Sequence, residues 1–147
     1  LPIMNTATEV GYGATIAALP SFVLLKNAVL GIFPSNPLVS EAIAINALAG
    51  ITGSASGGLS IALETLGSSY LQMARSLNIN PELLHRVASM SSGGFDTLPH
   101  NGAVITLLSI CALSHKDSYK DIFMVAVAVP VLATATVIIF GSLFGSF

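Results

Sequence analysis

The sequence predicts an all-α integral membrane protein, a multi-span bundle that contains broken helices or a re-entrant hairpin. Three observations lead to this fold class. The 147 residues are 53% hydrophobic and only 8% charged, with a mean hydropathy of +0.83, whereas a soluble domain carries about 25% charged residues. Four apolar stretches approach or exceed the roughly 20 residues that a helix needs to cross a bilayer. Two of these stretches are interrupted by tracts of serine and glycine.

The apolar stretches cover residues 10–33, 38–66, 87–113 and 122–147. A polar cluster that ends in Glu9 precedes the first stretch. Glu9 is therefore a candidate for proton handling, with an ordinary charged residue at a helix start as the alternative. A turn is expected at Phe33–Pro37, because each of its two prolines disfavours helix in the residue before it.

The second stretch is broken by the small-residue tract Gly53–Gly58. Each glycine lowers helix stability by about 1 kcal/mol, and serine offers the backbone competing hydrogen bonds. Broken backbone survives in a membrane only where it is buried in protein or lines a wet cavity. We therefore predict a substrate site that includes Ser54, Ser56, Gly57 and Gly58. The alternative is that Gly53 and Gly57 only allow helices to pack closely. For Glu41 and Glu64, near the ends of this stretch, exposure at the membrane interface is the simpler expectation.

Residues 67–90 are mixed in polarity and are expected to form an interfacial helical segment. Within this segment, Asn80-Pro81-Glu82 predicts a helix start. Asparagine is a favoured N-cap residue, proline suits the first helical position, and glutamate complements the helix dipole.

The third stretch contains the tract Ser91–Asn101, which close helix packing does not explain because it includes Asp96, Pro99 and His100. Ionisable residues inside apolar segments cost a few kcal/mol each and are functional candidates by default. A half-helix beginning at Gly102 would direct its free N–H groups into the break, as discontinuous helices do for anionic substrates in secondary transporters.

From this tract we predict substrate binding by Ser91, Ser92, Gly93, Gly94, Thr97 and Asn101. Asp96 and His100 are predicted to handle the coupling proton, because a buried carboxyl group and an imidazole both exchange protons reversibly. The alternative is that these two side chains cap backbone groups and hold the break open.

The end of the chain is expected to contain a short polar loop and one clear span. Ser114–Asp121 is predicted to be the loop, and residues 122–147, which carry no charge, are the clearest transmembrane helix. Pro130 is expected to kink this helix, which neighbouring helices in a bundle tolerate.

Several classes of function are disfavoured. A net charge of −2 offers no basic surface for nucleic acid. Pro99 lies between Asp96 and His100, so their spacing is not a helical zinc motif. No nucleophile elbow, dinucleotide-binding or phosphate-binding loop motif is present. We therefore expect no enzymatic activity, no cofactor and no metal ion.

Three segments of the chain resemble the gluconate permease family of gluconate:proton symporters. These are NTATEVGYGATIAALPSF, ASGGLSIAL and, above all, SSGGFDTLPHNGAVITLL. The resemblance is to the C-terminal part of that family, which belongs to the wider ion transporter superfamily, and it extends over nearly the whole chain. It implies a multi-pass protein of the bacterial inner membrane that takes up gluconate or a related small sugar acid or hydroxy acid together with protons.

The resemblance also implies an inverted-repeat transporter fold, with a hairpin tip at residues 53–58 and a broken-helix site at residues 91–101. Residues 1–147 are accordingly expected to be a single transmembrane domain, cut from the C-terminal part of a longer permease. The expected partners are the lipid bilayer, a small organic anion and a proton, and surfaces of small residues leave room for a homo-oligomer.

Two alternatives stay open. One is a transporter of the same superfamily that carries another organic anion, such as citrate, hydroxybutyrate or D-serine, or that uses sodium in place of protons. The other is a non-transporting membrane protein that assembles through Gly-xxx-Gly faces such as Gly141–Gly145.

Overall fold

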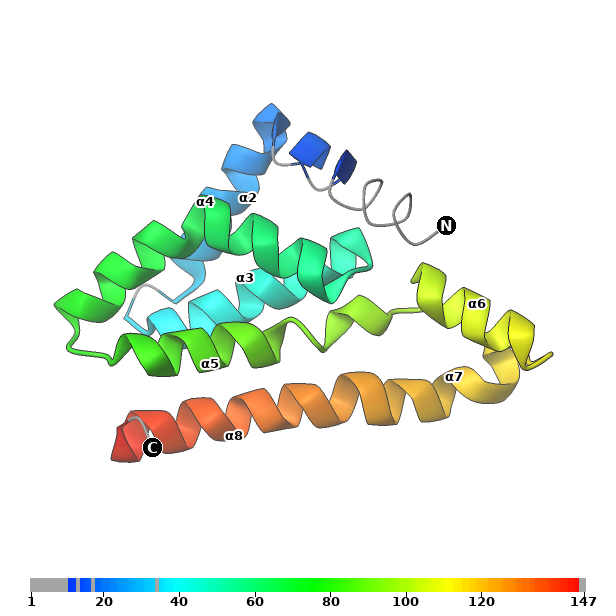
Figure 1. Cartoon of the computed structure of the whole chain (residues 1–147). Helices are drawn as coiled ribbons and strands as arrows, with labels where there is room; N and C mark the ends of the chain where they lie inside the picture. The colour runs from blue at the N-terminus through cyan, green and yellow to red at the C-terminus, as the bar shows by residue number, and fades with distance from the viewer. Residues whose placement is uncertain (1–10, 13, 17, 34, 146–147) are drawn as a thin grey trace.

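The chain folds into a bundle of helices of very different lengths (Figure 1). The computed structural model describes residues 11–145, apart from residues 13, 17 and 34. Glu9 lies outside the described residues, so its role stays a prediction. The helices are α2 (Pro20–Ile32), α3 (Pro37–Thr52), α4 (Ala55–Ser76), α5 (Pro81–Ser91), the 3-10 turn η1 (Phe95–Thr97), α6 (Gly102–Ile110), α7 (His115–Phe123), the π-helical segment η2 (Met124–Ala128) and α8 (Val129–Phe144). No strand occurs among the described residues.

Helices α3 and α4 form a hairpin that turns at Gly53 and Ser54 (Figure 1). Gly53 ends α3 in the left-handed conformation, with φ of 64°, which glycine adopts without steric cost. The side chain of Ser54 begins α4 by accepting a hydrogen bond from the N–H of Gly57 at 3.0 Å. The predicted break therefore exists but is short, because residues 56–58 already belong to the first turn of α4.

The hairpin is held together by close approach of its two backbones. A Cβ atom added at Gly58 would overlap the backbone of Ala49 on α3. A similar contact occurs between α5 and α8, where a Cβ atom at Gly141 would overlap the side chain of Leu83. These two glycines pack helices together inside the chain.

Helix α5 begins where the sequence predicts. The side chain of Asn80 accepts a hydrogen bond from the N–H of Glu82 at 2.9 Å, and Pro81 occupies the first helical position. Its apolar residues, Leu83, Leu84, Val87 and Ala88, are buried, and α5 packs against α3, α4 and α8. The apolar face of α5 thus has a partner within the protein, and an interfacial position of residues 67–90 stays a prediction.

The longest helix runs from His115 to Phe144 through α7, η2 and α8. It has 30 residues, so it is about 45 Å long, and an 18-residue stretch of it has a mean hydropathy of 2.6. Among the described residues it is the one helix long and apolar enough to cross a membrane, which supports a membrane protein, while the multi-span arrangement stays a prediction.

The predicted polar loop at residues 114–121 is wrong. The side chains of Ser114 and Asp117 form a capping box that begins α7, and α7 continues without a break into the apolar helix. A serine followed three residues later by an acidic residue is itself a helix-start signal, so this error could have been avoided from the sequence.

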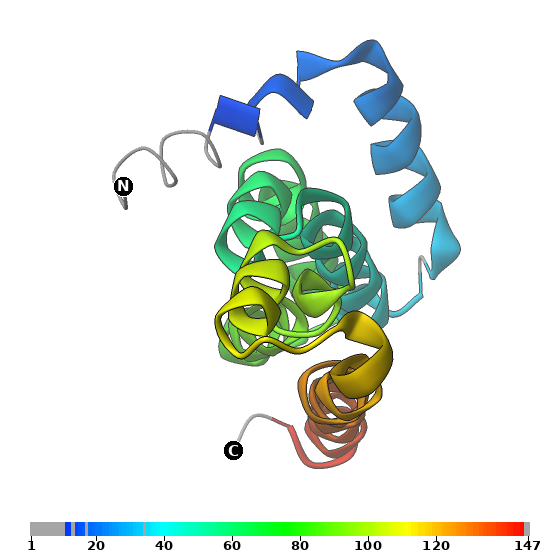
Figure 2. The same cartoon turned by 90° about the vertical axis from the view of Figure 1, so that its right-hand side faces the viewer.

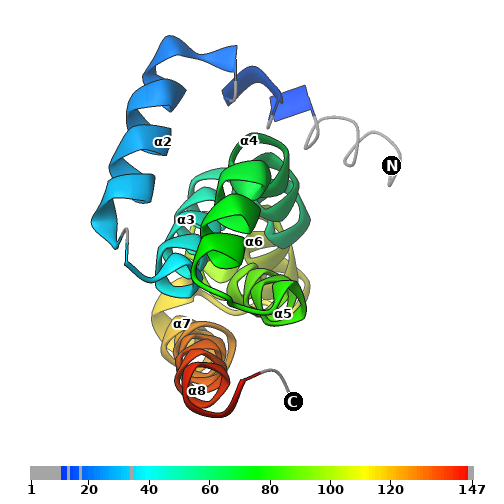
Figure 3. The same cartoon turned by 90° about the vertical axis from the view of Figure 1, so that its left-hand side faces the viewer.

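Helices α3, α4, α5 and α8 lie roughly along one direction, and α2 crosses it (Figure 1). The connection between α4 and α5 lies at one end of the bundle, next to the C-terminal end of α8, while α6 and α7 lie at the other end. Viewed along this direction, α3, α4 and α5 form a close group, with α2 on one side and α8 on another (Figures 2 and 3). The core between these helices includes Leu38, Ala44, Leu66, Tyr70 and Val87.

Pro130 connects the long helix to the second break. Proline has no N–H, so the carbonyl of Ala126 lacks its usual partner four residues later, and the π-helical segment η2 ends just before this position. The hydroxyl of Thr97 in η1 lies 3.2 Å from the carbonyl oxygens of both Ala126 and Gly94 and can donate to either. The broken segment is thereby attached to the middle of the long helix.

Candidate functional site

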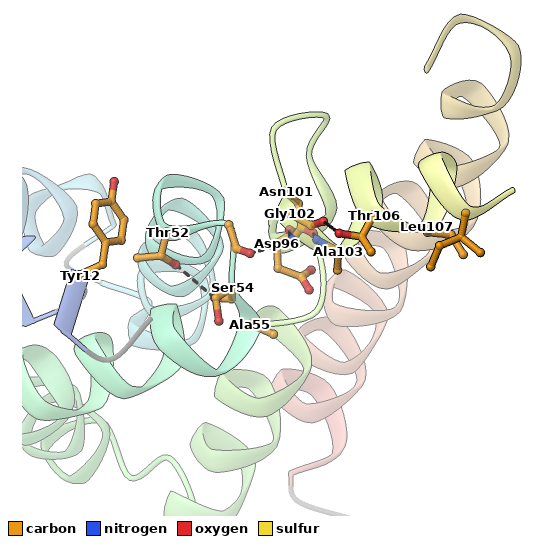
Figure 4. A pocket seen from close by; sticks show the side chains of 12 residues that line it. Tyr12, Thr52, Ser54, Ala55, Asp96, Asn101, Gly102, Ala103, Thr106 and Leu107 are labelled. Atoms are coloured by element: carbon orange, nitrogen blue, oxygen red, sulfur yellow. Dashed lines mark hydrogen bonds between the residues drawn. The ribbon is translucent and has the colours of Figure 1, made fainter. Parts of the chain in front are cut away.

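An open pocket of about 970 Å³ lies where the hairpin turn meets the start of α6 (Figure 4). It is lined by Tyr12, Thr52, Gly53, Ser54, Ala55, Asp96, Asn101, Gly102, Ala103, Thr106, Leu107 and Ile110. Helix α4 starts at Ala55 and α6 starts at Gly102, so two helix N-termini border the same pocket. Residues of both small-residue tracts, about 50 positions apart in the sequence, thus form one site.

Asn101 joins the two breaks. Its side-chain oxygen accepts hydrogen bonds from the N–H groups of Ala103 at 2.6 Å and Val104 at 3.0 Å, which caps α6. Its side-chain nitrogen donates to the carbonyls of Gly53 at 2.5 Å and Asp96 at 2.6 Å. Asn101 is 7% exposed, so all four bonds are sheltered from water. Sequence reasoning selected Asn101, and the structure gives its amide a connecting role.

His100 holds the hairpin from the same segment. Its Nε2 lies 2.8 Å from the carbonyl oxygen of Gly50, and because a carbonyl only accepts, Nε2 carries the proton and donates it. His100 does not line the pocket. Its contact in the structure is therefore of the kind that holds the break in place, and its part in proton handling stays a prediction.

Asp96 is the charged residue of the described pocket lining. Its Oδ1 atom is buried and has no hydrogen-bond partner among the described residues. A buried, unpaired carboxylate oxygen is costly. The free-energy cost of burying this oxygen is smaller when the carboxyl group is neutral. This position therefore favours a protonated Asp96.

Several residues predicted to bind substrate lie away from this pocket. The hydroxyls of Ser91 and Ser92 donate to the backbone carbonyls of Val87 at 2.6 Å and Ser89 at 2.8 Å. Gly94 faces Asn46 of α3, whose side-chain oxygen a Cβ atom would overlap. Gly93 and Thr97 are likewise not part of the lining, and neither are Ser56, Gly57 and Gly58. Substrate contact by these residues stays a prediction for another conformation of the site.

Sequence reasoning missed two hydroxyl side chains of the pocket, Thr52 and Thr106. The hydroxyl of Thr52 donates to the carbonyl of Leu48 at 2.8 Å, and that of Thr106 donates to the carbonyl of Gly102 at 2.7 Å. Both oxygens keep lone pairs that can accept a further hydrogen bond. A signal was available, because Thr52 immediately precedes the first break and Thr106 lies one turn into the half-helix that follows the second.

The electrostatics of the pocket come mainly from its backbone. Each helix N-terminus carries about half a positive charge on N–H groups that have no partner within the helix. No lysine or arginine occurs in the described lining. An anion in this pocket would therefore be held by helix ends and hydroxyl groups rather than by a cationic side chain.

A homologue of this chain is named as a transporter. The chain is 53% identical over 137 residues, 93% of its length, to the uncharacterized transporter YxjC of Bacillus subtilis strain 168. The match covers 28% of that relative's length. No protein-family model matches the chain, and no solved structure matches it.

Proposed function

We propose that this chain is the C-terminal part of a secondary active transporter in the bacterial inner membrane. The proposed activity is proton-coupled uptake of gluconate or a related small sugar acid or hydroxy acid. Homology to a protein named as a transporter supports the class. The substrate and the coupling ion follow from the resemblance to the gluconate permease family. The observation that carries the proposal is the meeting of two helix N-termini at one open polar pocket.

The anion would be recognised by its carboxylate and its hydroxyl groups separately. The side chains of Ser54 and Asn101 accept from three N–H groups at the starts of α4 and α6. The partial positive charge of these two helix ends suits a carboxylate, since helix N-termini bind anions. The hydroxyls of Thr52, Ser54 and Thr106 and the pocket volume suit the hydroxyl groups of a sugar acid.

Proton coupling follows from the position of Asp96 in the same pocket. An ionised Asp96 would repel a bound carboxylate by about 3 to 4 kcal/mol at separations of about 4 to 6 Å and an effective dielectric constant of about 20. A protonated Asp96 removes this repulsion and can donate a hydrogen bond. Anion binding and protonation of Asp96 therefore favour each other, which is the thermodynamic requirement for symport.

The assembly alternative has less support than transport. It relies on Gly-xxx-Gly faces such as Gly141–Gly145, but Gly141 is occupied by a contact with Leu83 inside the chain. The sodium-coupled alternative is separated from proton coupling by experiment. In proteoliposomes that contain the full-length protein, uptake that persists on a sodium gradient after the proton gradient is collapsed would support sodium.

The deciding experiment compares Asp96→Asn with the wild type in reconstituted full-length protein. For the wild type we expect gluconate affinity to fall as pH rises, by about 100-fold or more once Asp96 ionises. For Asp96→Asn we expect an affinity that no longer depends on pH and uptake that no longer follows the proton gradient. Glu64→Gln, an exposed position on α4, is the matched control and should behave as the wild type.

If Asp96→Asn kept both uptake and proton coupling, the role of Asp96 would be wrong. A panel of gluconate, other sugar acids, hydroxy acids, citrate and D-serine identifies the substrate in the same assay. If the wild type moved none of these anions, the transport proposal itself would fail.

A further inference from the structure

Glu41 is buried in the core of the bundle. It lies in the second turn of α3 and is 2% exposed, although its position near the end of an apolar stretch predicts exposure at the membrane interface. That expectation is wrong because α2, α4, α5 and α8 pack around α3. The Oε2 atom of Glu41 is buried and has no hydrogen-bond partner among the described residues.

Ser40, the neighbour of Glu41 in the chain, and Tyr70 of α4 direct their hydroxyl protons to other oxygens. The hydroxyl of Ser40 donates to the carbonyl of Val29 at 2.9 Å. Ser40 also lies 3.1 Å from the hydroxyl of Tyr70, and since its own proton is used, Tyr70 is the donor of that bond. The proton of Tyr70 is thus directed to Ser40.

No described cation neutralises Glu41. The ionisable side chains of α4 and α5 other than Tyr70 are exposed, namely Glu64, Arg75, Glu82, His85 and Arg86. Asp96 in η1 has the same sign of charge as Glu41, α8 has no ionisable residue, and the described side chains of α2 carry no charge. An isolated carboxylate in such a core would cost several kcal/mol, so the group holds a proton instead.

Resting on the transport function proposed above, we infer that Glu41 is a second proton-coupling residue, distinct from Asp96. In the described conformation its carboxyl group is loaded with a proton taken from water. A rearrangement of the helices around α3 that admits water would release this proton from the same oxygen atoms. Glu41 lies eleven residues before Thr52 on α3, about 17 Å from the pocket along the helix, so the two protons bind at separate sites.

A second proton changes the charge balance of transport. One anion and the proton of Asp96 together carry no net charge, whereas the further proton of Glu41 adds one positive charge. An inside-negative membrane potential of about 100 mV should then raise gluconate accumulation about 50-fold in the wild type. In Glu41→Gln this response to the potential should disappear. Exchange of labelled for unlabelled gluconate, which needs no net proton movement, should remain.

The measurement uses reconstituted full-length protein, with the potential set by a potassium gradient and an ionophore. Glu64→Gln is the matched control and should respond to the potential as the wild type does. Glutamine has the size of a protonated glutamate, so Glu41→Gln should fold and purify normally. Failure to fold would overturn the inference, because a neutral side chain of the same size would then not replace the carboxyl group in this core.

The remaining outcomes separate this inference from the proposed function. If wild-type uptake did not respond to the potential, or if Glu41→Gln still responded, the inference would be wrong while transport would stand. Loss of exchange in a folded Glu41→Gln protein would also contradict it, because Glu41 would then act in substrate handling. If the wild type moved no anion, the proposed function would fail first.

Discussion

The two breaks in the bundle are built in different ways. The first, at Gly53 and Ser54, is a short turn between two helices that pack against each other, and it depends on local backbone conformation. The second, between α5 and α6, spans residues 92–101, and its side chains reach across to α3 through His100 and Asn101. The hairpin is thus the framework, and the second break is positioned on it by side-chain hydrogen bonds.

This difference predicts that the second break is the more sensitive to loss of one side chain. Asn101→Ala removes two bonds that cap α6, one that joins the second break to Gly53 and one to Asp96 within the second break. At about 1 kcal/mol for each hydrogen bond, we expect a loss of about 3 to 4 kcal/mol in the free energy of unfolding. Thermal unfolding of the detergent-solubilised protein would measure this change, and gluconate affinity should fall with it.

Asn36→Ala is the matched control for Asn101→Ala. Asn36 also caps a helix, accepting a hydrogen bond from the N–H of Val39 at 3.3 Å, but no bond from it to another segment is recorded among the described residues. We expect a loss of about 1 kcal/mol, typical of an N-cap. Equal losses for the two variants would show that the bonds from Asn101 to Gly53 and Asp96 contribute little.

The first break should respond to backbone conformation instead. Gly53→Ala places a side chain at φ of 64°, which costs an L-residue about 1 to 2 kcal/mol. Space is not the obstacle, because the nearest atom to an added Cβ atom, the Cα of Asn101, is 3.8 Å away. Gly53→Asn should lose less stability, since asparagine also occurs in the left-handed position that ends a helix.

The same thermal unfolding measurement tests this prediction. Gly102→Ala is the control, because a Cβ atom at Gly102 meets nothing within 4 Å and its φ is not positive. If Gly53→Asn lost more stability than Gly53→Ala, the side chain rather than the backbone conformation would be limiting.

Local patterns in the sequence predicted the breaks but not their meeting. The Ser-Gly tracts and the Asn80-Pro81 helix start depend on residues close in the chain, and both correspond to helix ends in the structure. The hydrogen bond from Asn101 to Gly53 joins residues 48 apart. No local pattern encodes such a contact, because it depends on how α3 and α6 are placed by all the other helices.

The burial of Glu41 could not be predicted from the sequence, for a related reason. Apolar residues lie on every side of α3, and ten of its residues are buried, so its pattern does not define a single inner face from which the direction of Glu41 could be predicted. The place of Thr52 and Thr106 in the pocket could have been predicted, since each lies beside a break that the sequence predicts. The structure therefore adds Thr52 and Thr106 to the predicted site. It also places Glu41 in the core, although the sequence predicts that this residue is exposed.

The smallest expected effect concerns the bond between the second break and the long helix. Thr97→Val keeps the shape of the side chain but removes the hydroxyl that can donate to the carbonyl of Ala126. We expect a loss of about 1 kcal/mol in the free energy of unfolding.

Pro130→Ala restores an N–H that can bond to the same carbonyl, so Thr97→Val should cost less in that background. A double-mutant cycle should give a coupling energy of about 0.5 to 1 kcal/mol. An equal cost in both backgrounds would mean that Thr97 does not replace the hydrogen bond that Pro130 removes.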